Sequence, residues 1–167
     1  MRALIAEDDP LFRRVLEQLL SSNFDLVLAE DGNTAWKLLQ QEDGPKLAIL
    51  DWVMPGISGP QLCRELRAHS KTNGIYLILL TARNSAADII SGLDAGADDY
   101  VTKPVQPEEL RARVRLGCRI LELQTALAAR NEALAGSLAQ ASLAQKLSRF
   151  LHARNSAQKL PPAKLSI

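Results

Sequence analysis

The sequence is poor in aromatic residues and contains no long apolar run. Aromatic side chains account for 4% of the 167 residues and hydrophobic residues for 47%, so the core must be mainly aliphatic. No stretch approaches the roughly 20 apolar residues of a membrane-spanning helix. Glu7 and Asp8 occur early enough to exclude the apolar stretch of a signal peptide. We therefore expect a cytoplasmic chain with no membrane segment.

Cysteine is also scarce. Cys63 and Cys118 lie far from each other and from other residues of metal-ligand type. Two isolated cysteines are typical of a reduced protein rather than of a disulfide scaffold or a zinc site. His69 and His152 have no partners at a useful spacing, so we expect both to be surface residues.

The formal net charge of +1 conceals two parts of opposite sign. Residues 1–107 hold 10 Lys/Arg and 15 Asp/Glu, whereas residues 108–167 hold 10 Lys/Arg and 4 Asp/Glu. A group of acidic residues that binds a cation explains the first part. The basic residues of the second part are thinly spread and have no aromatic or recognition motif beside them. We therefore expect a solvated helix face there, and no nucleic-acid partner.

Five short aliphatic runs alternate with amphipathic stretches. Such runs are typical of strands that are buried on both faces of a parallel sheet. They lie at residues 3–6, 26–29, 47–50 and 75–80, and a short fifth run ends at Tyr100–Val101. The amphipathic stretches between them carry apolar residues at helical spacing: Leu11, Val15, Leu16, Leu19 and Leu20; Ala35, Leu38 and Leu39; Leu62 and Leu66; Ile89, Ile90 and Leu93. The alternation predicts a doubly wound α/β fold with strand order 2-1-3-4-5.

A long helix is predicted after Pro107. No proline occurs from 108 to 160, and apolar residues recur at spacings of three and four, with breaks near 130–131 and 136. The residues of this stripe are Leu116, Ile120, Leu123, Leu127, Leu134, Leu138, Ala141, Leu143, Leu147 and Phe150. An imperfect heptad predicts a two-stranded coiled coil with a register shift; the alternative is one amphipathic helix that folds back onto the domain.

These patterns divide the chain into three parts. We expect a compact domain over 1–120, a helical coiled-coil extension of its fifth helix over 121–155, and a disordered tail over 156–167.

Polar side chains follow the predicted strands, where an α/β fold places its ligand site. Glu7, Asp8 and Asp9 follow the first strand, Asp51 ends the third and Thr81 the fourth, and Lys103-Pro104 follows the fifth. Crowded carboxylates need a cation, and oxygen ligands favour Mg²⁺. Asp51 is then a candidate nucleophile. Lys103 and Thr81 are candidate donors to phosphate oxygens, and a cis bond before Pro104 would turn Lys103 inward.

Four motifs in this order resemble the response-regulator receiver domain of bacterial two-component signalling. They are LIAEDDP at 4–10, AILDWVMPGISG at 48–59, ILLTA at 78–82 and ADDYVTKP at 97–104. The resemblance covers roughly residues 1–120. It implies a flavodoxin-like fold, a phosphoryl group received from a histidine kinase or phosphotransfer protein, and no independent enzyme activity.

The resemblance also implies roles for single residues. Asp51 would be the phospho-acceptor. Asp8 would bind Mg²⁺ together with Asp51 and the backbone carbonyl of Val53, and Glu7 would hold the ion through water. Asp9 would instead be the N-cap of the first helix.

The remaining site residues would read out the phosphate. Thr81 and Tyr100 would form the switch pair, in which the hydroxyl turns toward the phosphate and the ring moves inward. Lys103 would bridge to the phosphoryl group.

Two positions depart from the commoner pattern of the family. Val53 stands two residues after Asp51, and Arg83 two residues after Thr81, where polar side chains often orient the hydrolytic water. Valine cannot bond this water, so we expect slow self-dephosphorylation. Ser58 replaces a frequent acidic residue, and we assign it no consequence.

The segment RVRLGCRILELQTALAARNEAL at 113–134 resembles the linker helix of diguanylate cyclase response regulators. In that family the receiver dimerises through its fourth helix, fifth strand and fifth helix. No GGDEF or GGEEF motif occurs here. Either the output domain is absent from the chain, or the helix is itself the output.

The leading hypothesis is a homodimer whose helix pairing is controlled by phosphorylation, and other functions are alternatives to it. One is a stand-alone phosphate shuttle or protein-binding adaptor that does not dimerise. Another is a phosphohydrolase, but such enzymes usually carry a second acid where Val53 stands. DNA binding would need a helix-turn-helix or similar unit, and none follows residue 120.

Overall fold

The computed structural model describes residues 1–82 and 85–157. Its elements are β1 (Arg2–Ala6), α1 (Pro10–Leu20), β2 (Asp25–Ala29), α2 (Gly32–Leu39), β3 (Leu47–Asp51), α3 (Gly59–Ala68), β4 (Tyr76–Thr81), α4 (Ala86–Asp94), β5 (Asp99–Thr102) and α5 (Pro107–Ala157). All strand pairs are parallel, in the order β2-β1-β3-β4-β5. The predicted fold class and strand order are confirmed.

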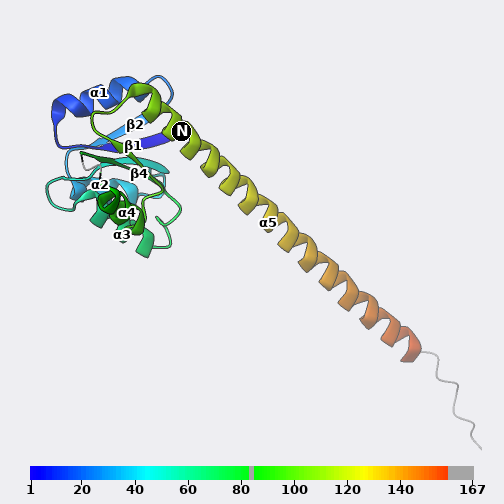
Figure 1. Ribbon diagram of the computed structural model, residues 1–167. Helices are drawn as coiled ribbons and strands as arrows, with labels where there is room; N and C mark the ends of the chain where they lie inside the picture. Colours follow the sequence, from blue (N-terminus) through cyan, green and yellow to red (C-terminus); the bar gives the residue numbers. More distant parts are fainter. Residues whose placement is uncertain (83–84, 158–167) are drawn as a thin grey trace, which may run out of the picture. The chain divides into compact units, whose positions relative to one another are not determined.

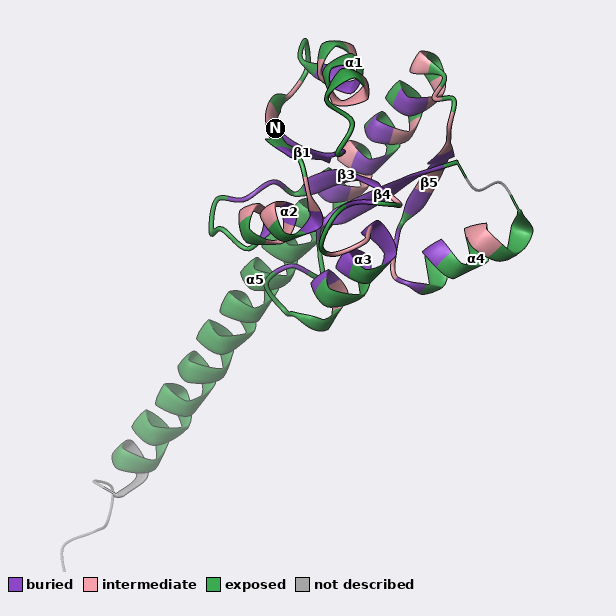
Figure 2. Cartoon of the chain, turned by 90° about the vertical axis from the view of Figure 1, so that its left-hand side faces the viewer, coloured by how far each residue is buried: buried purple, intermediate pink, exposed green. Residues whose placement is uncertain are grey.

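Two layers of helices cover the sheet in the unit Met1–Glu122 (Figure 1). Alternate residues of the strands point to opposite faces. On one face Ile5, Ile49 and Ile78 pack with Leu16 of α1 and Leu110 of α5. On the other face Leu4, Leu50 and Leu79 pack with residues of α2 and α3, among them Leu39, Leu62 and Leu66. Figure 2 shows this buried centre between exposed helix surfaces.

The prediction that every strand is buried on both faces is wrong for β2. Asp25 and Leu28 are exposed and Leu26 and Val27 are half-buried, because β2 is an edge strand of the sheet and has a neighbour on one side only. Leu28 is exposed as a result. The expected core face of α1 is also narrower than predicted, because Leu11 and Val15 are exposed while Leu16 and Leu20 are buried.

The start of α1 follows the sequence prediction. Asp9 is its N-cap, and Asp9 Oδ1 accepts hydrogen bonds from the backbone N–H groups of Leu11 at 2.8 Å and Phe12 at 3.3 Å. Pro10 has no N–H to satisfy at the first helical position. Asp9 therefore caps the helix, and the carboxylates of the two preceding residues, Glu7 and Asp8, remain for other roles.

The first turns of α5 pack tightly on the sheet through a glycine. A Cβ on Gly117 would lie 2.5 Å from the Tyr76 ring and 3.1 Å from a methyl carbon of Leu47. No larger residue fits there unless the Tyr76 ring moves. The close packing of α5 on the sheet therefore requires glycine at position 117.

Leu123–Ile167 forms a second unit, of which residues 123–157 are described as helix. The helix continues through Arg130, Asn131 and Gly136, where the spacing of the apolar residues is interrupted. Every residue from 123 to 154 is exposed in the single chain. Among the described residues no helix is long and apolar enough to cross a membrane. Most of the tail expected to be disordered, 158–167, lies outside the described residues.

Candidate functional site

Three carboxylates meet at the carboxyl end of the sheet. Glu7 and Asp8 follow β1, and Asp51 is the last residue of β3, which pairs with β1 so that Ala6 lies opposite Leu50. One oxygen of each carboxylate lies within 4.8 Å of the others. Glu7 and Asp51 are buried and Asp8 is exposed. Close oxygen ligands of this kind suit a hard divalent cation.

Lys103 enters this cluster from the end of β5. Its Nζ lies 2.8 Å from Asp51 Oδ1 and 2.9 Å from Glu7 Oε2. The peptide bond between Lys103 and Pro104 is cis, as anticipated from the sequence. The ammonium also lies 4.7 Å from the centroid of the Phe12 ring. The lysine thus brings one positive charge to two buried carboxylates.

The electrostatics of the site follow from burial and pairing. Burial raises the pKa of Glu7 above its ordinary value, against the opposing effect of the Lys103 hydrogen bond. Burial alone would lower the pKa of Lys103, but its hydrogen bonds to Asp51 and Glu7 outweigh burial, and that pKa is raised. Lys103 therefore stays charged at neutral pH and can attract an anion.

A cavity of about 170 Å³ opens beside Asp51. It is lined by Asp51, Trp52, Val53, Thr81, Ala82 and Lys103. Thr81 is buried at the end of β4, and Val53 is 65% exposed. The cavity therefore joins a carboxylate, a hydroxyl and an ammonium, which suits a small oxyanion.

Comparison with known proteins assigns the fold to a family. Residues 3–115 match the family model of the response regulator receiver domain. The chain belongs to this family. The phosphate regulon transcriptional regulatory protein PhoB of Escherichia coli is 43% identical over 115 residues, which are 68% of this chain and 50% of that protein.

Two solved receiver domains are similar to this one. The receiver domain of the Francisella response regulator 1452 is 32% identical with a TM-score of 0.65, and the match covers 74% of this chain and 98% of that one. The receiver domain of the sensor histidine kinase PA1611 from Pseudomonas aeruginosa is 28% identical with a TM-score of 0.64, and the match covers 70% and 95%. Its structure has a magnesium ion coordinated in the active site cleft.

The chain spans about half the length of the curated relatives it matches, PhoB among them. Those relatives include proteins named as transcriptional regulators. The similarity therefore identifies the receiver domain and leaves the output of this chain to be inferred.

The receiver places Thr81 and Tyr100 as diagonal neighbours. Thr81 pairs with Thr102 and Leu79 with Tyr100, so Thr81 and Tyr100 lie on the same face of adjacent strands, two residues apart in register. Tyr100 is half-buried and packs against the cluster that contains Leu79. Arg83, the other departure noted in the sequence, lies outside the described residues.

Besides Phe12, which contacts the Lys103 ammonium, two further residues that touch the site were not predicted from the sequence. Arg13 Nη1 donates a 2.6 Å hydrogen bond to the backbone carbonyl of Glu7. The backbone N–H of Trp52 donates to Asp51 Oδ1 at 2.9 Å. Each of these two hydrogen bonds involves a backbone group, and every residue has such groups, so the sequence does not indicate where these hydrogen bonds form.

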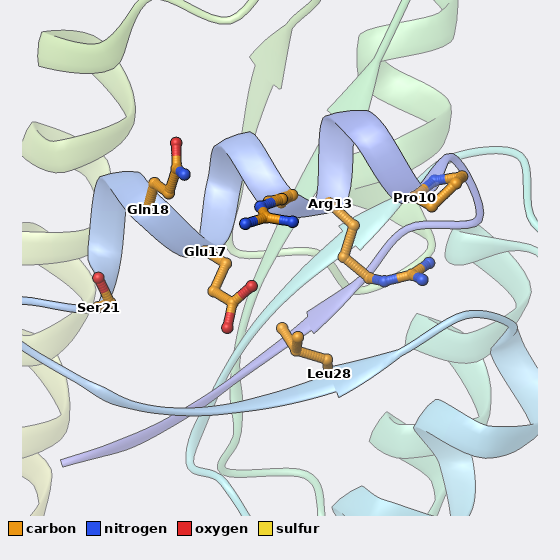
Figure 3. Close-up of a pocket in the computed structure, with 7 residues that line it drawn as sticks. Pro10, Arg13, Glu17, Gln18, Ser21 and Leu28 are labelled. Carbon is orange, nitrogen blue, oxygen red and sulfur yellow. The ribbon is translucent and has the colours of Figure 1, made fainter.

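A larger hollow of about 470 Å³ lies between α1 and the edge strand β2. Figure 3 shows Arg13, Glu17 and Leu28 at its rim. None of the site residues predicted from the sequence lines it. The side chains that line it carry charges of both signs, and we assign no function to this hollow.

Proposed function

We propose that this chain is a two-component response regulator that accepts a phosphoryl group on Asp51 from a histidine kinase or phosphotransfer protein. The observation that carries the proposal is the contact of Lys103 with both Asp51 and Glu7, in the same cluster as Asp8. A buried carboxylate with a fixed ammonium beside it is prepared for an anionic reagent. The proposed setting is the cytoplasm.

In the proposed transfer, an Asp51 carboxylate oxygen attacks the phosphorus of a phosphohistidine. The new O–P bond forms as the P–N bond breaks, and its electron pair remains on the imidazole nitrogen, which takes up a proton. Lys103 and the Thr81 hydroxyl would hold two phosphoryl oxygens at the cavity. The protein mainly positions the groups and compensates charge.

The donor set of the cluster fits Mg²⁺. Asp8 and Asp51 would bind the ion directly with the backbone carbonyl of Val53, and Glu7 would hold it through water. The magnesium site of the PA1611 receiver domain supports this assignment. When bound, the ion supplies positive charge to the incoming phosphoryl oxygens. Asp9 takes no part, because its carboxylate caps α1.

Acetyl phosphate with Mg²⁺ tests the proposed function without a cognate kinase. We expect the mass of the intact protein to increase by one phosphoryl group. A protein that gains no phosphoryl group and also fails to bind beryllofluoride, a phosphoryl mimic, would contradict the proposal.

Val53 is expected to make the phosphoryl group long-lived. Its exposed side chain cannot orient a hydrolytic water, so phospho-Asp51 should last for minutes or longer. Val53→Asn supplies a hydrogen-bonding group and should shorten the half-life about tenfold or more. Val53→Ala is the control for side-chain size. The loss of phosphoryl mass with time measures both, and a wild-type half-life of seconds would refute the idea.

The proposed output is a change in self-association. Thr81 and Tyr100 would rearrange on phosphorylation and alter the face formed by α4, β5 and α5, through which two copies would pair. Residues 1–120 would act as the receiver, and 121–155 as a coiled coil that resembles the linker helix of diguanylate cyclase response regulators. The exposed leucines of α5, among them Leu127 and Leu134, supply the apolar stripe such a pairing needs.

Light scattering after size exclusion tests this output. Beryllofluoride is expected to shift wild type toward the dimer, and Asp51→Asn is expected not to respond. Leu127→Lys removes from each copy one leucine that the proposed dimer would bury, and should weaken the dimer at least about 100-fold. Ala128→Lys is the control for the added charge. A monomer at all concentrations, with or without beryllofluoride, would favour the shuttle or adaptor instead.

A further inference from the structure

Helix α4 is held to the domain by very little buried surface. Of its nine residues, all of which the structure describes, only Gly92 is buried. Ile89 is half-buried, whereas Ile90 is 56% exposed and Leu93 is 41% exposed, so most of the apolar stripe expected from the sequence lies outside the core. An element with so few buried side chains opens at low free energy and responds to small changes around it.

The one buried position of α4 faces the residue next to Asp51. A Cβ on Gly92 would lie 2.9 Å from Cζ3 of the Trp52 indole and 3.0 Å from a methyl carbon of Leu79. Gly92 is helical, so glycine is needed here for space and not for its backbone conformation. The indole thus lies directly against the backbone of α4.

The other side of Trp52 belongs to the candidate site. Trp52 lines the cavity beside Asp51. Its backbone N–H donates to Asp51 Oδ1 at 2.9 Å and to the Leu80 carbonyl at 2.8 Å, and its carbonyl accepts from Gly59 N–H at 3.1 Å. One residue therefore contacts both the carboxylate of Asp51 and the buried point of α4.

Phosphorylation of Asp51 would change the surroundings of Trp52. When a carboxylate becomes an acyl phosphate, its oxygens lose most of their negative charge and accept hydrogen bonds less strongly. The Trp52 N–H would then lose a charged acceptor, while a phosphoryl group fills the cavity that Trp52 lines. Because Gly92 contacts the ring, a shift of the indole toward α4 would displace the helix backbone, and a shift away from α4 would leave a cavity between them.

We propose that the contact between Trp52 and Gly92 is a mechanical link that transmits the phosphorylation state of Asp51 to α4. The link rests on the proposed function and adds a route distinct from the Thr81–Tyr100 pair. Trp52 acts as a positioning residue, since it touches the acceptor through its backbone and α4 through its ring.

Hydrogen exchange of α4, followed by mass spectrometry with and without beryllofluoride and Mg²⁺, tests the link. Fluorine NMR of bound beryllofluoride measures occupancy independently of any tryptophan. In wild type, the exchange of the Ala86–Asp94 amides is expected to change about fivefold or more on binding, the lower end of ordinary coupling between sites. In Trp52→Leu, compared with wild type at equal beryllofluoride occupancy by fluorine NMR, the change in the exchange of α4 is expected to be lost.

Gly92→Ala and the double variant separate coupling from packing. Gly92→Ala is expected to raise the exchange of α4 before beryllofluoride is added, because the methyl group displaces the helix from the indole. Trp52→Leu with Gly92→Ala makes room for the methyl and should restore slow exchange, but not the response. Trp36→Leu, at the chain's other tryptophan, and Gly136→Ala, where a Cβ meets no described atom within 4 Å, are the controls.

The outcomes are distinguishable. A wild-type response of α4 that survives in Trp52→Leu and in Gly92→Ala overturns the link but leaves the proposed function intact. Bound beryllofluoride with no response of α4 in wild type does the same. Wild type that binds no beryllofluoride overturns the proposed function, and the link with it. If Gly92→Ala does not fold, Trp52→Leu decides alone.

Discussion

Replacing Asp51 with asparagine is expected to reduce phosphoryl uptake from acetyl phosphate to the background of the assay. Asparagine keeps the size of the side chain and one acceptor oxygen for the Trp52 N–H, but the amide is not a nucleophile. The expected loss is at least about 1,000-fold in the rate of uptake, equivalent to about 4 kcal/mol. The mass of the intact protein, followed with time, measures it.

The control for this variant is Asp25→Asn, which also removes one negative charge. Asp25 lies at the start of β2 in an exposed ion pair with Arg2, away from the carboxyl end of the sheet. Asp25→Asn should take up phosphoryl at the wild-type rate. Uptake by Asp51→Asn at a rate near wild type would show that another residue is the acceptor and would remove the basis of the proposed function.

Loss of the metal site is expected to have the second largest effect. Asp8→Asn removes a charged oxygen ligand from the cluster of Glu7, Asp8 and Asp51. Since a bound divalent ion contributes several kcal/mol to such a transfer, uptake at fixed Mg²⁺ should fall at least about 100-fold. Removal of Mg²⁺ by a chelator should slow wild type to a similar extent and should have little further effect on Asp8→Asn.

Asp9→Asn is a matched control for the adjacent acid. Asparagine is as good an N-cap as aspartate, so α1 should remain stable and uptake should stay close to wild type. Equal losses of phosphoryl uptake in Asp8→Asn and Asp9→Asn would contradict the separate roles proposed for the two acids. In the structure Asp9 Oδ1 accepts hydrogen bonds from two helix N–H groups. A binding titration with Mg²⁺ separates weaker metal binding from slower transfer.

Much of the site could be predicted because it lies where strands end. Parallel strands in a known order bring their carboxyl ends to one edge of the sheet, so the residues that follow them must converge. Glu7, Asp8, Asp51 and Lys103 are together in the structure for that reason. The order in which polar residues follow apolar runs is visible in the sequence, and it suffices to predict their meeting.

The contacts that the sequence did not reveal are close approaches between distant elements. Gly92 against Trp52 and Gly117 against Tyr76 depend on the absence of a side chain, and a glycine inside a helix has the same appearance whether it fits a ring or faces water. Gly136 is such a case, since no described atom lies near its missing Cβ. The exposure of Leu11 and Leu28 likewise depends on which surfaces remain uncovered, which hydrophobic spacing alone does not determine.

The unbroken course of α5 restricts which of its apolar residues can share one seam. At about 3.6 residues per turn, Leu127, Leu134 and Leu138 are separated by whole turns and lie on one side of the helix. Leu143 follows Leu134 by about two and a half turns, so Leu143 and, with it, Leu147 and Phe150 lie on the opposite side. In a parallel coiled coil that packs through Leu127, Leu134 and Leu138, the later apolar residues Leu143, Leu147 and Phe150 would therefore face solvent. The apolar interface of such a pair would end near Ala141.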